Sequence, residues 1–290
     1  MNIKNIGLLI LCIFVGCASS SKKTAASASK NTSQEESDVS VDSESYSVAD
    51  ESETVAEQKK TVVAKSVDAG IESRLNQALS QQNESDITKS SFEVLVTNPQ
   101  SLKALNALGV INYKKNKFKA AEYFFNKALK THPNESSLYN NLGLIKLAQG
   151  EAREAISLFK TGLTHNGNDK FILANLGSLY VTNKDFKNAE IALEPLYKSG
   201  TKDLKLISNY ALSLVGNNKF PEATAVYEKA LKENQSSREI MLNYSIHLIE
   251  NLKKNNEGMD LISRLKFVGV PEEARNVIKD LENKAKAGLN

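Results

Sequence analysis

The sequence predicts an all-α solenoid of helix hairpins, because three columns of residues recur at one spacing. Leu-Gly pairs lie 34 residues apart, at Leu108-Gly109, Leu142-Gly143 and Leu176-Gly177. An alanine column and a largely aromatic column keep the same step: Ala121, Ala155, Ala189 and Ala223, then Phe125, Phe159, Leu193 and Tyr227. A fixed period of this size indicates stacked repeats, each of which buries its apolar face against the next. An unrelated helical bundle would not keep such a phase.

The order Leu-Gly, Ala, aromatic, with Pro133 closing one unit, resembles the tetratricopeptide repeat (TPR). The resemblance covers residues 68–270, with units that begin at residues 68, 102, 136, 170, 204 and 238. In the last unit Gly258 stands in the alanine column after a slip of one residue. The resemblance implies a right-handed superhelical solenoid of about six hairpins, whose first helices line a concave groove.

Residues 1–16 are predicted to be a lipoprotein signal peptide. The apolar run at residues 6–15 is too short to span about 30 Å of hydrocarbon as a helix. Residues 14–17, Phe-Val-Gly-Cys, resemble the lipobox of bacterial lipoproteins, although Leu is commoner than Phe14 there. The resemblance implies that Cys17 carries acyl chains such as palmitate, and the absence of Asp after Cys17 favours the outer membrane, with the domain facing the periplasm or the cell surface. The alternative is an ordinary signal peptide followed by a chance cysteine.

Residues 17–66 are predicted to be a disordered tether. Between Asn31 and Gln58 there are nine Asp or Glu residues and no Lys or Arg, with many Ser and Thr. Such a stretch cannot bury enough apolar surface to fold. A solvated spacer is the simpler interpretation; docking of this acidic block on a basic face of the domain is the alternative.

Turn residues and a final amphipathic segment complete the predicted solenoid. Clusters such as Lys115-Asn116-Lys117, Gln149-Gly150-Glu151 and Gly216-Asn217-Asn218 fall where each hairpin must reverse. Small residues at the eighth and twentieth places of a unit let its two helices pack closely. Residues 271–290 open with Pro271 and predict a helix that caps the open end of the stack.

The TPR resemblance places a column of asparagines in the groove. The sixth place of a unit is often Asn in the family, and here it is Asn141, Asn175, Asn209 and Asn243, whereas the two earlier units have Ser73 and Ala107. A carboxamide offers two donors and an acceptor, so the column can pair with the main chain of a bound peptide. The alternative, that each Asn bonds a neighbouring helix, is open.

The remaining groove places are largely apolar. The predicted peptide-binding residues among them are Val110, Tyr113, Leu144, Leu147, Phe171, Leu212 and Ile246; Val181, Val215, Leu242 and Ile249 share these places, and a third to a half of the whole set is expected to be core. A clamp for a terminal carboxylate needs Lys and Asn where this chain has Val110, Leu144 and Leu212. The lining instead suits an amphipathic helix or an extended hydrophobic segment.

One unit carries a basic cluster, which we interpret as a solvated face. Its members are Lys103, Lys114, Lys115, Lys117, Lys119, Lys127 and Lys130. Anionic lipid headgroups, a glycan or the acidic tether are alternative partners for it.

Composition excludes several other functions. A net charge of +3 is too small to suggest nucleic-acid binding. The only cysteines are Cys12 and Cys17, the three histidines are scattered, and no phosphate loop or nucleophile motif is present, so we expect no enzyme activity, no cofactor and no metal site.

The predicted function is that of an outer-membrane TPR lipoprotein, a scaffold that binds a protein partner of the cell envelope. The plan is similar to that of two groups of lipidated repeat proteins. Pilotins, which bring the secretin of type IV pili to the outer membrane, have about six repeats but usually lack so long a tether. Adaptors for peptidoglycan hydrolases or motility machinery are the less favoured alternative.

Overall fold

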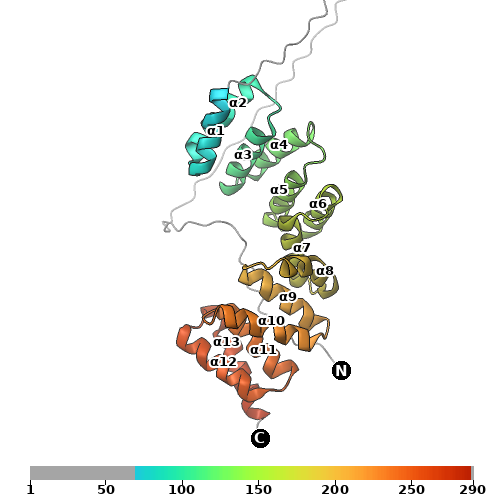
Figure 1. The fold of residues 1–290 in the computed structure, drawn as a ribbon, viewed down its shortest axis with the longest axis vertical. Helices are drawn as coiled ribbons and strands as arrows, with labels where there is room; N and C mark the ends of the chain where they lie inside the picture. The colour runs from blue at the N-terminus through green and yellow to red at the C-terminus, as the bar shows by residue number, and fades with distance from the viewer. Residues whose placement is uncertain (1–68, 289–290) are drawn as a thin grey trace, which may run out of the picture. The chain divides into compact units, whose positions relative to one another are not determined.

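The computed structural model describes residues 69–288, and every regular element within them is a helix (Figure 1). Twelve α-helices pair into six consecutive hairpins, and a thirteenth follows them. Their bounds are α1 Ala69–Gln81, α2 Glu84–Thr97, α3 Leu102–Lys114, α4 Phe118–Leu129, α5 Ser136–Ala148, α6 Ala152–His165, α7 Lys170–Thr182, α8 Phe186–Lys198, α9 Leu204–Gly216, α10 Phe220–Glu233, α11 Arg238–Ile246, α12 Asn255–Val268 and α13 Arg275–Ala287.

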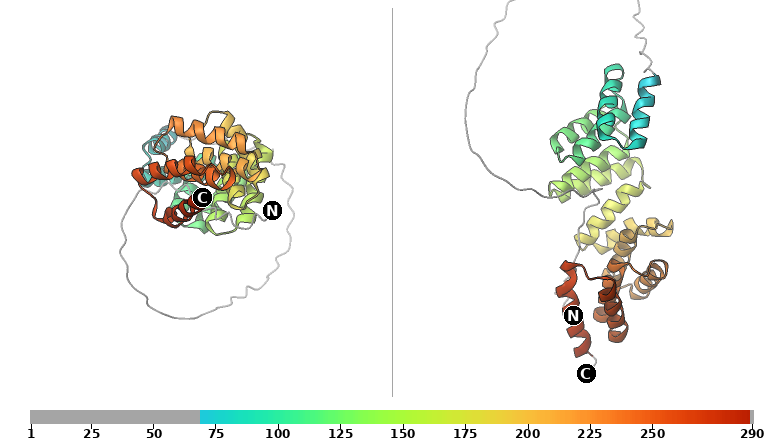
Figure 2. Two further views of the ribbon diagram at one scale, coloured as in Figure 1. Left: turned by 90° about the horizontal axis from the view of Figure 1, so that it is seen from below. Right: turned by 90° about the vertical axis from the view of Figure 1, so that its left-hand side faces the viewer.

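Each hairpin packs on the next in chain order (Figures 1 and 2). The predicted fold class, an all-α solenoid of about six hairpins with a C-terminal helix, is confirmed for the described part of the chain. The first helices after α1 begin at Leu102, Ser136, Lys170, Leu204 and Arg238, which are the starts of the sequence units. Several of them follow a side-chain cap: Asp169 Oδ1, for example, accepts from the backbone of Phe171 at 3.0 Å and of Ile172 at 3.2 Å.

The glycine and aromatic columns meet inside the hairpins. A Cβ atom added at Gly109 would overlap the ring of Phe125, and one at Gly143 would overlap the ring of Phe159. Both rings are buried, with 1% and 0% of their surface exposed. The two columns therefore repeat every 34 residues because the same contact repeats in each hairpin: the glycine of the first helix lies directly against the aromatic side chain of the second helix.

Every hairpin turn contains one residue with a positive φ. In the first five units this residue is the fifteenth of the unit, and in the sixth unit it is the sixteenth. The six residues, in chain order, are Gln82, Asn116, Gly150, Lys184, Asn218 and Lys253. A hydrogen bond then closes the turn, as from Lys219 N to Leu214 O at 2.9 Å. The turn geometry is thus constant, although glycine, the residue that adopts this conformation without strain, occurs only once.

The one-residue slip in the last unit is a turn of π-helix. After α11 the chain continues as π-helix at His247–Asn251, so α12 begins at the eighteenth place of its unit instead of the seventeenth. The closing hydrogen bond correspondingly spans one residue more, from Lys254 N to Leu248 O at 2.8 Å. The inserted residue is absorbed inside the first helix, and the turn that follows keeps its form.

The core consists of three apolar clusters along the stack. The first joins α1 to α3, the second α3 to α5, and the third runs from α6 to α13. The final helix belongs to this third cluster through Ile278, Leu281 and Ala285, after a short 3-10 turn at Glu272–Ala274. None of the helices between residues 69 and 288 has the length and apolar character needed to cross a membrane.

Candidate functional site

The asparagine column joins the first helices of successive hairpins. Asn141 Nδ2 donates to Asn106 Oδ1 at 2.8 Å, and Asn175 Nδ2 donates to Asn140 Oδ1 at 2.8 Å. In both cases a sixth-place Asn bonds the fifth-place residue of the unit before it. The column is therefore a ladder of side-chain bonds between neighbouring hairpins.

The ladder continues with serine as the acceptor. Asn243 Nδ2 donates to Ser208 Oγ at 2.8 Å, which again is the fifth place of the preceding unit. That place is Ala174 in the unit before Asn209, and Asn209 Nδ2 instead reaches Ser178 Oγ at 3.0 Å. The sequence identified the donors but missed these acceptors, whose residue type varies from unit to unit.

Each ladder amide uses only part of its hydrogen-bonding capacity within the described residues. A carboxamide has two N–H donors and an acceptor oxygen, and one N–H of each Asn is engaged by the ladder. Asn141, Asn175 and Asn243 are half-buried, while Asn209 is buried. The contact to a neighbouring helix thus exists, and pairing of the remaining groups with a bound peptide stays a prediction.

The predicted apolar lining divides by burial. Phe171 is 77% exposed, whereas the other predicted peptide-binding side chains are half-buried: Val110, Tyr113, Leu144, Leu147, Leu212 and Ile246. Val181, Leu242 and Ile249 are buried and belong to the core, as expected for part of this set. The ring of Tyr113 lies 6.0 Å from that of Phe118, and burial raises the pKa of its phenol.

Three of the predicted residues meet in one pocket between α9 and α11. Leu212, Asn243 and Ile246 line it together with Tyr227 and His247, and the pocket has a volume of about 30 Å³. The sequence analysis did not assign Tyr227 or His247 to a site. One signal was present: His247 precedes the one-residue slip. Its place in the unit is apolar in three earlier units (Ile111, Ile145 and Leu179) but polar in the other two (Gln77 and Ser213).

His247 is almost completely enclosed by aromatic rings. It is 1% exposed, and the rings of Phe220, Tyr227 and Tyr244 lie 5.6, 6.0 and 6.5 Å from its ring centre. Burial lowers the pKa of His247, partly opposed by a hydrogen bond to the Phe220 backbone, so the ring is neutral at pH 7. The Nε2 atom lies 3.1 Å from Thr224 Oγ1.

Two buried polar atoms, on residues that line this pocket, have no hydrogen-bond partner among the described residues. They are His247 Nδ1 and the hydroxyl oxygen of Tyr227, a side chain with 0% exposure. Burial raises the pKa of the Tyr227 phenol, which therefore stays protonated. Both atoms are fully enclosed by the surrounding side chains and are therefore unpaired polar groups of the core.

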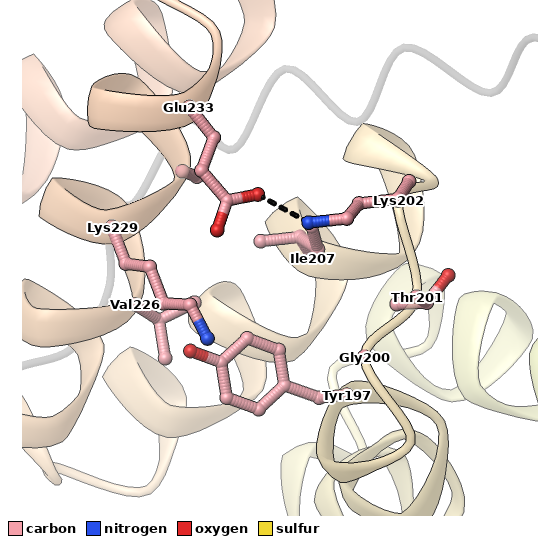
Figure 3. A pocket seen from close by; sticks show the side chains of 9 residues that line it. Tyr197, Gly200, Thr201, Lys202, Ile207, Val226, Lys229 and Glu233 are labelled. Atoms are coloured by element: carbon pink, nitrogen blue, oxygen red, sulfur yellow. Dashed lines mark hydrogen bonds and ion pairs between the residues drawn. The ribbon is translucent and has the colours of Figure 1, made fainter.

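A second hollow lies among α8, α10 and the loop before α9 (Figure 3). Lys202 Nζ and Glu233 Oε2 are 2.8 Å apart at its rim, and this contact lowers the pKa of Glu233. Lys229 Nζ sits 5.5 Å from the ring centre of Tyr197. Because the charged groups already engage partners within the hollow, its geometry does not single out a ligand.

The basic cluster lies on α3, α4 and the turns that follow them. Lys103 and Lys115 approach Glu72 and Glu84 at 3.8 and 3.6 Å. The remaining members are exposed or half-buried: Lys114, Lys117, Lys119, Lys127 and Lys130. This exposure is compatible with a solvated face and with each alternative partner, so the interpretation stays a prediction.

The predicted lipidation site, Cys17, lies outside the described residues, as do the signal peptide and the whole of the predicted tether. Between residues 69 and 288, no group of three or more His, Cys, Asp or Glu side chains is arranged to hold a metal ion.

Two family models of the tetratricopeptide repeat match the chain, at residues 77–136 and 124–157. No curated protein matches it. Among solved structures, the chain is similar to pilF of Pseudomonas aeruginosa, with 19% identity and a TM-score of 0.60 over 75% of this chain and 97% of that one. It is also similar to YrrB, described as a TPR protein with an unusual peptide-binding site, with 15% identity and a TM-score of 0.59 over 69% and 99% of the two chains.

A TPR protein from Parabacteroides merdae is a further structural relative, with 16% identity and a TM-score of 0.54 over 74% of this chain and 98% of that one. At such identities the likeness concerns the fold. Residues 77–157 are therefore tetratricopeptide repeats by sequence, and residues 69–288 fold as a tetratricopeptide-repeat solenoid.

Proposed function

We propose that this protein is a non-enzymatic scaffold, anchored in the outer membrane through Cys17, that binds a peptide segment of an envelope protein along its first helices. The face in question is formed by α3, α5, α7, α9 and α11 and carries the asparagine ladder with its apolar neighbours; we call it the first-helix face. A TPR solenoid has a protein partner as its typical ligand, and the tether would hold it clear of the membrane.

The asparagine ladder carries the proposal. Its amides are fixed in orientation by the bonds to the preceding hairpin, so their remaining N–H and C=O groups are pre-organised at regular intervals. Fixed groups lose less conformational entropy on binding than mobile ones. The half-buried side chains of Leu144, Leu147 and Leu212 lie among them and offer apolar contact.

A pilotin that assists assembly of the type IV pilus secretin is the second candidate. The six hairpins agree with the repeat number of that group, whereas the long segment between Cys17 and α1 departs from its plan. Loss of secretin multimers on deletion of the gene would support this candidate. Intact multimers together with altered cell-wall turnover would support an adaptor for peptidoglycan hydrolases.

Capture of partners from envelope extracts tests the scaffold function. We expect Leu144→Asp or Leu212→Asp to lose the partner that the parent protein enriches, because a carboxylate would be buried against the bound segment. Binding should change little with moderate salt, since hydrophobic contact dominates it. Ile191→Asp is the matched control, because Ile191 is 61% exposed on the second helix α8.

Two results would overturn this proposal. One is retention of the partner by both folded Asp variants, with circular dichroism used to verify folding. The other is strongly salt-dependent capture that is lost on substitution of Lys119 and Lys127, which would move the site to the basic cluster.

Membrane attachment is tested separately. Cys17→Ser should move the protein from the membrane fraction to the soluble fraction, because acyl chains supply the anchor. A Cys17→Ser protein that still sediments with membranes at high salt would contradict the lipidation of Cys17, and Cys12→Ser serves as the control.

A further inference from the structure

We propose that a surface on the second helices of the first two hairpins docks on an anionic phospholipid membrane. It consists of exposed apolar and aromatic side chains on α2 and α4 and of the lysines beside them, and we call it the aromatic–lysine surface. Its members are Phe92, Val96, Tyr123, Lys89, Lys119 and Lys127. The proposal goes beyond the proposed function and does not rest on it.

Exposed apolar side chains gather on these two helices. Seven large apolar or aromatic side chains between residues 69 and 288 are exposed, and three of them lie on α2 and α4: Phe92, Val96 and Tyr123, with 50%, 82% and 60% of their surface exposed. The ring of the half-buried Phe124 joins them, since its centre lies 6.5 Å from that of Phe92 and 5.3 Å from that of Tyr123. The three rings form one continuous patch across two hairpins, and such patches mark interaction sites.

The first unit departs from later units at two of these places. The twenty-fifth place is Phe92, whereas the five later units have polar residues there, namely Asn126, Lys160, Glu194, Glu228 and, after the slip, Ser263. The twenty-ninth place is Val96, whereas the next four units have Lys130, Thr164, Lys198 and Lys232, and the last has Phe267. Tyr123 stands at a place that varies from unit to unit. Polar residues at the twenty-fifth place build equivalent hairpins, so the fold does not require Phe92 there.

The lysines of the surface stand directly beside its apolar side chains. Lys89 lies one turn before Phe92, and Lys119 and Lys127 lie one turn before and after Tyr123. None of the three has an ion-pair partner among the described residues. Their positive charge is therefore available to an anionic partner.

The carboxylates of α2 and α4 do not neutralise these lysines. Three of the four are engaged elsewhere: Glu93 with Arg74 at 3.1 Å, Glu122 with Lys146 at 3.1 Å and Glu84 with Lys115 at 3.6 Å. The fourth, Asp86, lies in the first turn of α2, where the helix dipole stabilises a negative charge.

This composition favours a membrane over a protein partner. Protein–protein interfaces are rich in aromatic residues and Arg but poor in Lys. Aromatic residues together with Lys are typical of the boundary between lipid headgroups and acyl chains, where the rings contact the chains and the ammonium groups contact the phosphates. A segment of about 50 residues, such as the one between Cys17 and α1, permits contact with the membrane as well as distance from it.

Vesicle co-sedimentation tests the proposal. The protein is the chain from residue 17 on with Cys17→Ser, so that neither the signal peptide nor an acyl chain contributes. We expect binding to vesicles of phosphatidylethanolamine and phosphatidylglycerol in equal parts, and at least tenfold weaker binding to vesicles of phosphatidylcholine alone, because only the former carry net negative charge. Binding should weaken as the salt concentration rises from about 0.1 to 1 M, which shortens the Debye length from about 10 to 3 Å.

Two double variants separate the charged from the apolar contribution. Lys119→Gln with Lys127→Gln should weaken binding to the anionic vesicles about 25-fold, the equivalent of about 1 kcal/mol for each lysine. Val96→Ser with Tyr123→Ser should weaken it about tenfold, because contact with the acyl region is lost. Circular dichroism verifies that each variant is folded.

Phe267→Ser is the matched control and should bind like the parent protein. Phe267 is 94% exposed and stands at the twenty-ninth place of the last unit, like Val96 in the first. Its neighbour Lys266 is paired with Glu282 at 2.6 Å, so this aromatic side chain lacks a free lysine beside it.

An environment-sensitive fluorophore reports insertion into the bilayer. The label NBD attached at Val96→Cys should shift to the blue on the anionic vesicles, because it enters an apolar region. The same label at Ile191→Cys, on α8, should not shift. The only native cysteines are Cys12 and Cys17, so the label has a single site in this protein.

Three results would overturn the proposal: no binding to the anionic vesicles, equal binding by the parent protein and both double variants, or equal shifts of the label at residues 96 and 191. The first would leave an acidic protein segment as the better occupant of the surface. Capture of a partner by the first-helix face is measured without vesicles, so the scaffold function and this membrane contact can fail separately.

Discussion

At the scale of single residues, the buried side chain of His247 should make the stability of the folded protein depend on pH. The imidazole is enclosed by aromatic rings, and burial lowers its pKa below the usual value of about 6.5. Below about pH 6.5 the imidazole of the unfolded chain is protonated more readily than that of the folded chain. Protonation therefore favours the unfolded state, and the free energy of unfolding decreases as the pH falls below 7. We expect the free energy of unfolding to drop between about pH 7 and pH 5, and His247→Leu should show a smaller drop.

Chemical denaturation at several pH values measures this effect. His165→Gln is the matched control, because it also removes an imidazole and His165 is exposed. Parallel stability curves for the parent protein and His247→Leu would show that His247 is not the titrating group.

The asparagine ladder should contribute to stability as well as to binding. Asn175→Ala removes its bond to Asn140 and is expected to cost about 0.5–1.5 kcal/mol, the net value of a typical hydrogen bond. A double-mutant cycle with Asn140→Ala should give a coupling energy of the same size. Full additivity of the two losses would mean that the bond does not persist in solution; Asn126→Ala, on the exposed side of α4, is the control.

The sequence identified the asparagines that donate the ladder hydrogen bonds but not the residues that accept them. Each Asn is recognisable by its place in a unit, whereas its acceptor lies on another hairpin and changes from Asn106 and Asn140 to Ser178 and Ser208. Choosing the acceptor requires the offset between neighbouring first helices, which side-chain packing sets. The Tyr227–His247 pair was missed for a related reason, since its two members lie on helices of different units.

At the scale of elements, the hairpin turn is the most regular feature of the chain. Its positive-φ residue is Lys184 in the turn between α7 and α8, with φ of 59°. A side chain with a Cβ atom costs roughly 1–2 kcal/mol in this conformation, and glycine avoids that cost at some expense in entropy. We therefore expect Lys184→Gly to stabilise the protein by about 0.4–1 kcal/mol in chemical denaturation.

The turn prediction has a matched control within the next helix. Ile191→Gly, at an exposed position near the middle of α8, should destabilise the protein by about 0.5–1 kcal/mol. Destabilisation by both substitutions would indicate that the left-handed conformation of Lys184 is not maintained in solution.

Helix starts could be predicted from the 34-residue phase because packing of the hairpin fixes the contact between the eighth-place glycine and the aromatic residue. The form of the one-residue slip could not. A longer turn and a π-helix turn consume the same extra residue, and the choice at His247–Asn251 depends on tertiary packing around His247.

At the scale of the whole molecule, a solenoid has mainly nearest-neighbour contacts, so damage at one end should remain local. Leu281 is 1% exposed and packs α13 into the last apolar cluster. Leu281→Ala should cost about 2–5 kcal/mol of local stability. Hydrogen exchange should accelerate in α12 and α13 and stay unchanged in α3 to α6.

A uniform increase of exchange along the whole chain in Leu281→Ala would contradict this local behaviour and indicate a single cooperative unit. Leu105→Ala is the matched comparison, because Leu105 is 0% exposed near the other end, in the cluster that joins α3 to α5. Its effect should centre on α3 to α5.

Binding along the first-helix face is tested most directly by photo-crosslinking in cells. A benzophenone amino acid would replace Leu144 or Phe171 on that face, or, as controls, Ile191 on α8 or Phe267 on α12, which are 61% and 94% exposed. We predict that Leu144 and Phe171 give adducts with one and the same envelope protein and that Ile191 and Phe267 do not. Adducts from Ile191 or Phe267, with none from Leu144 and Phe171, would contradict the assignment of the binding site to the first helices.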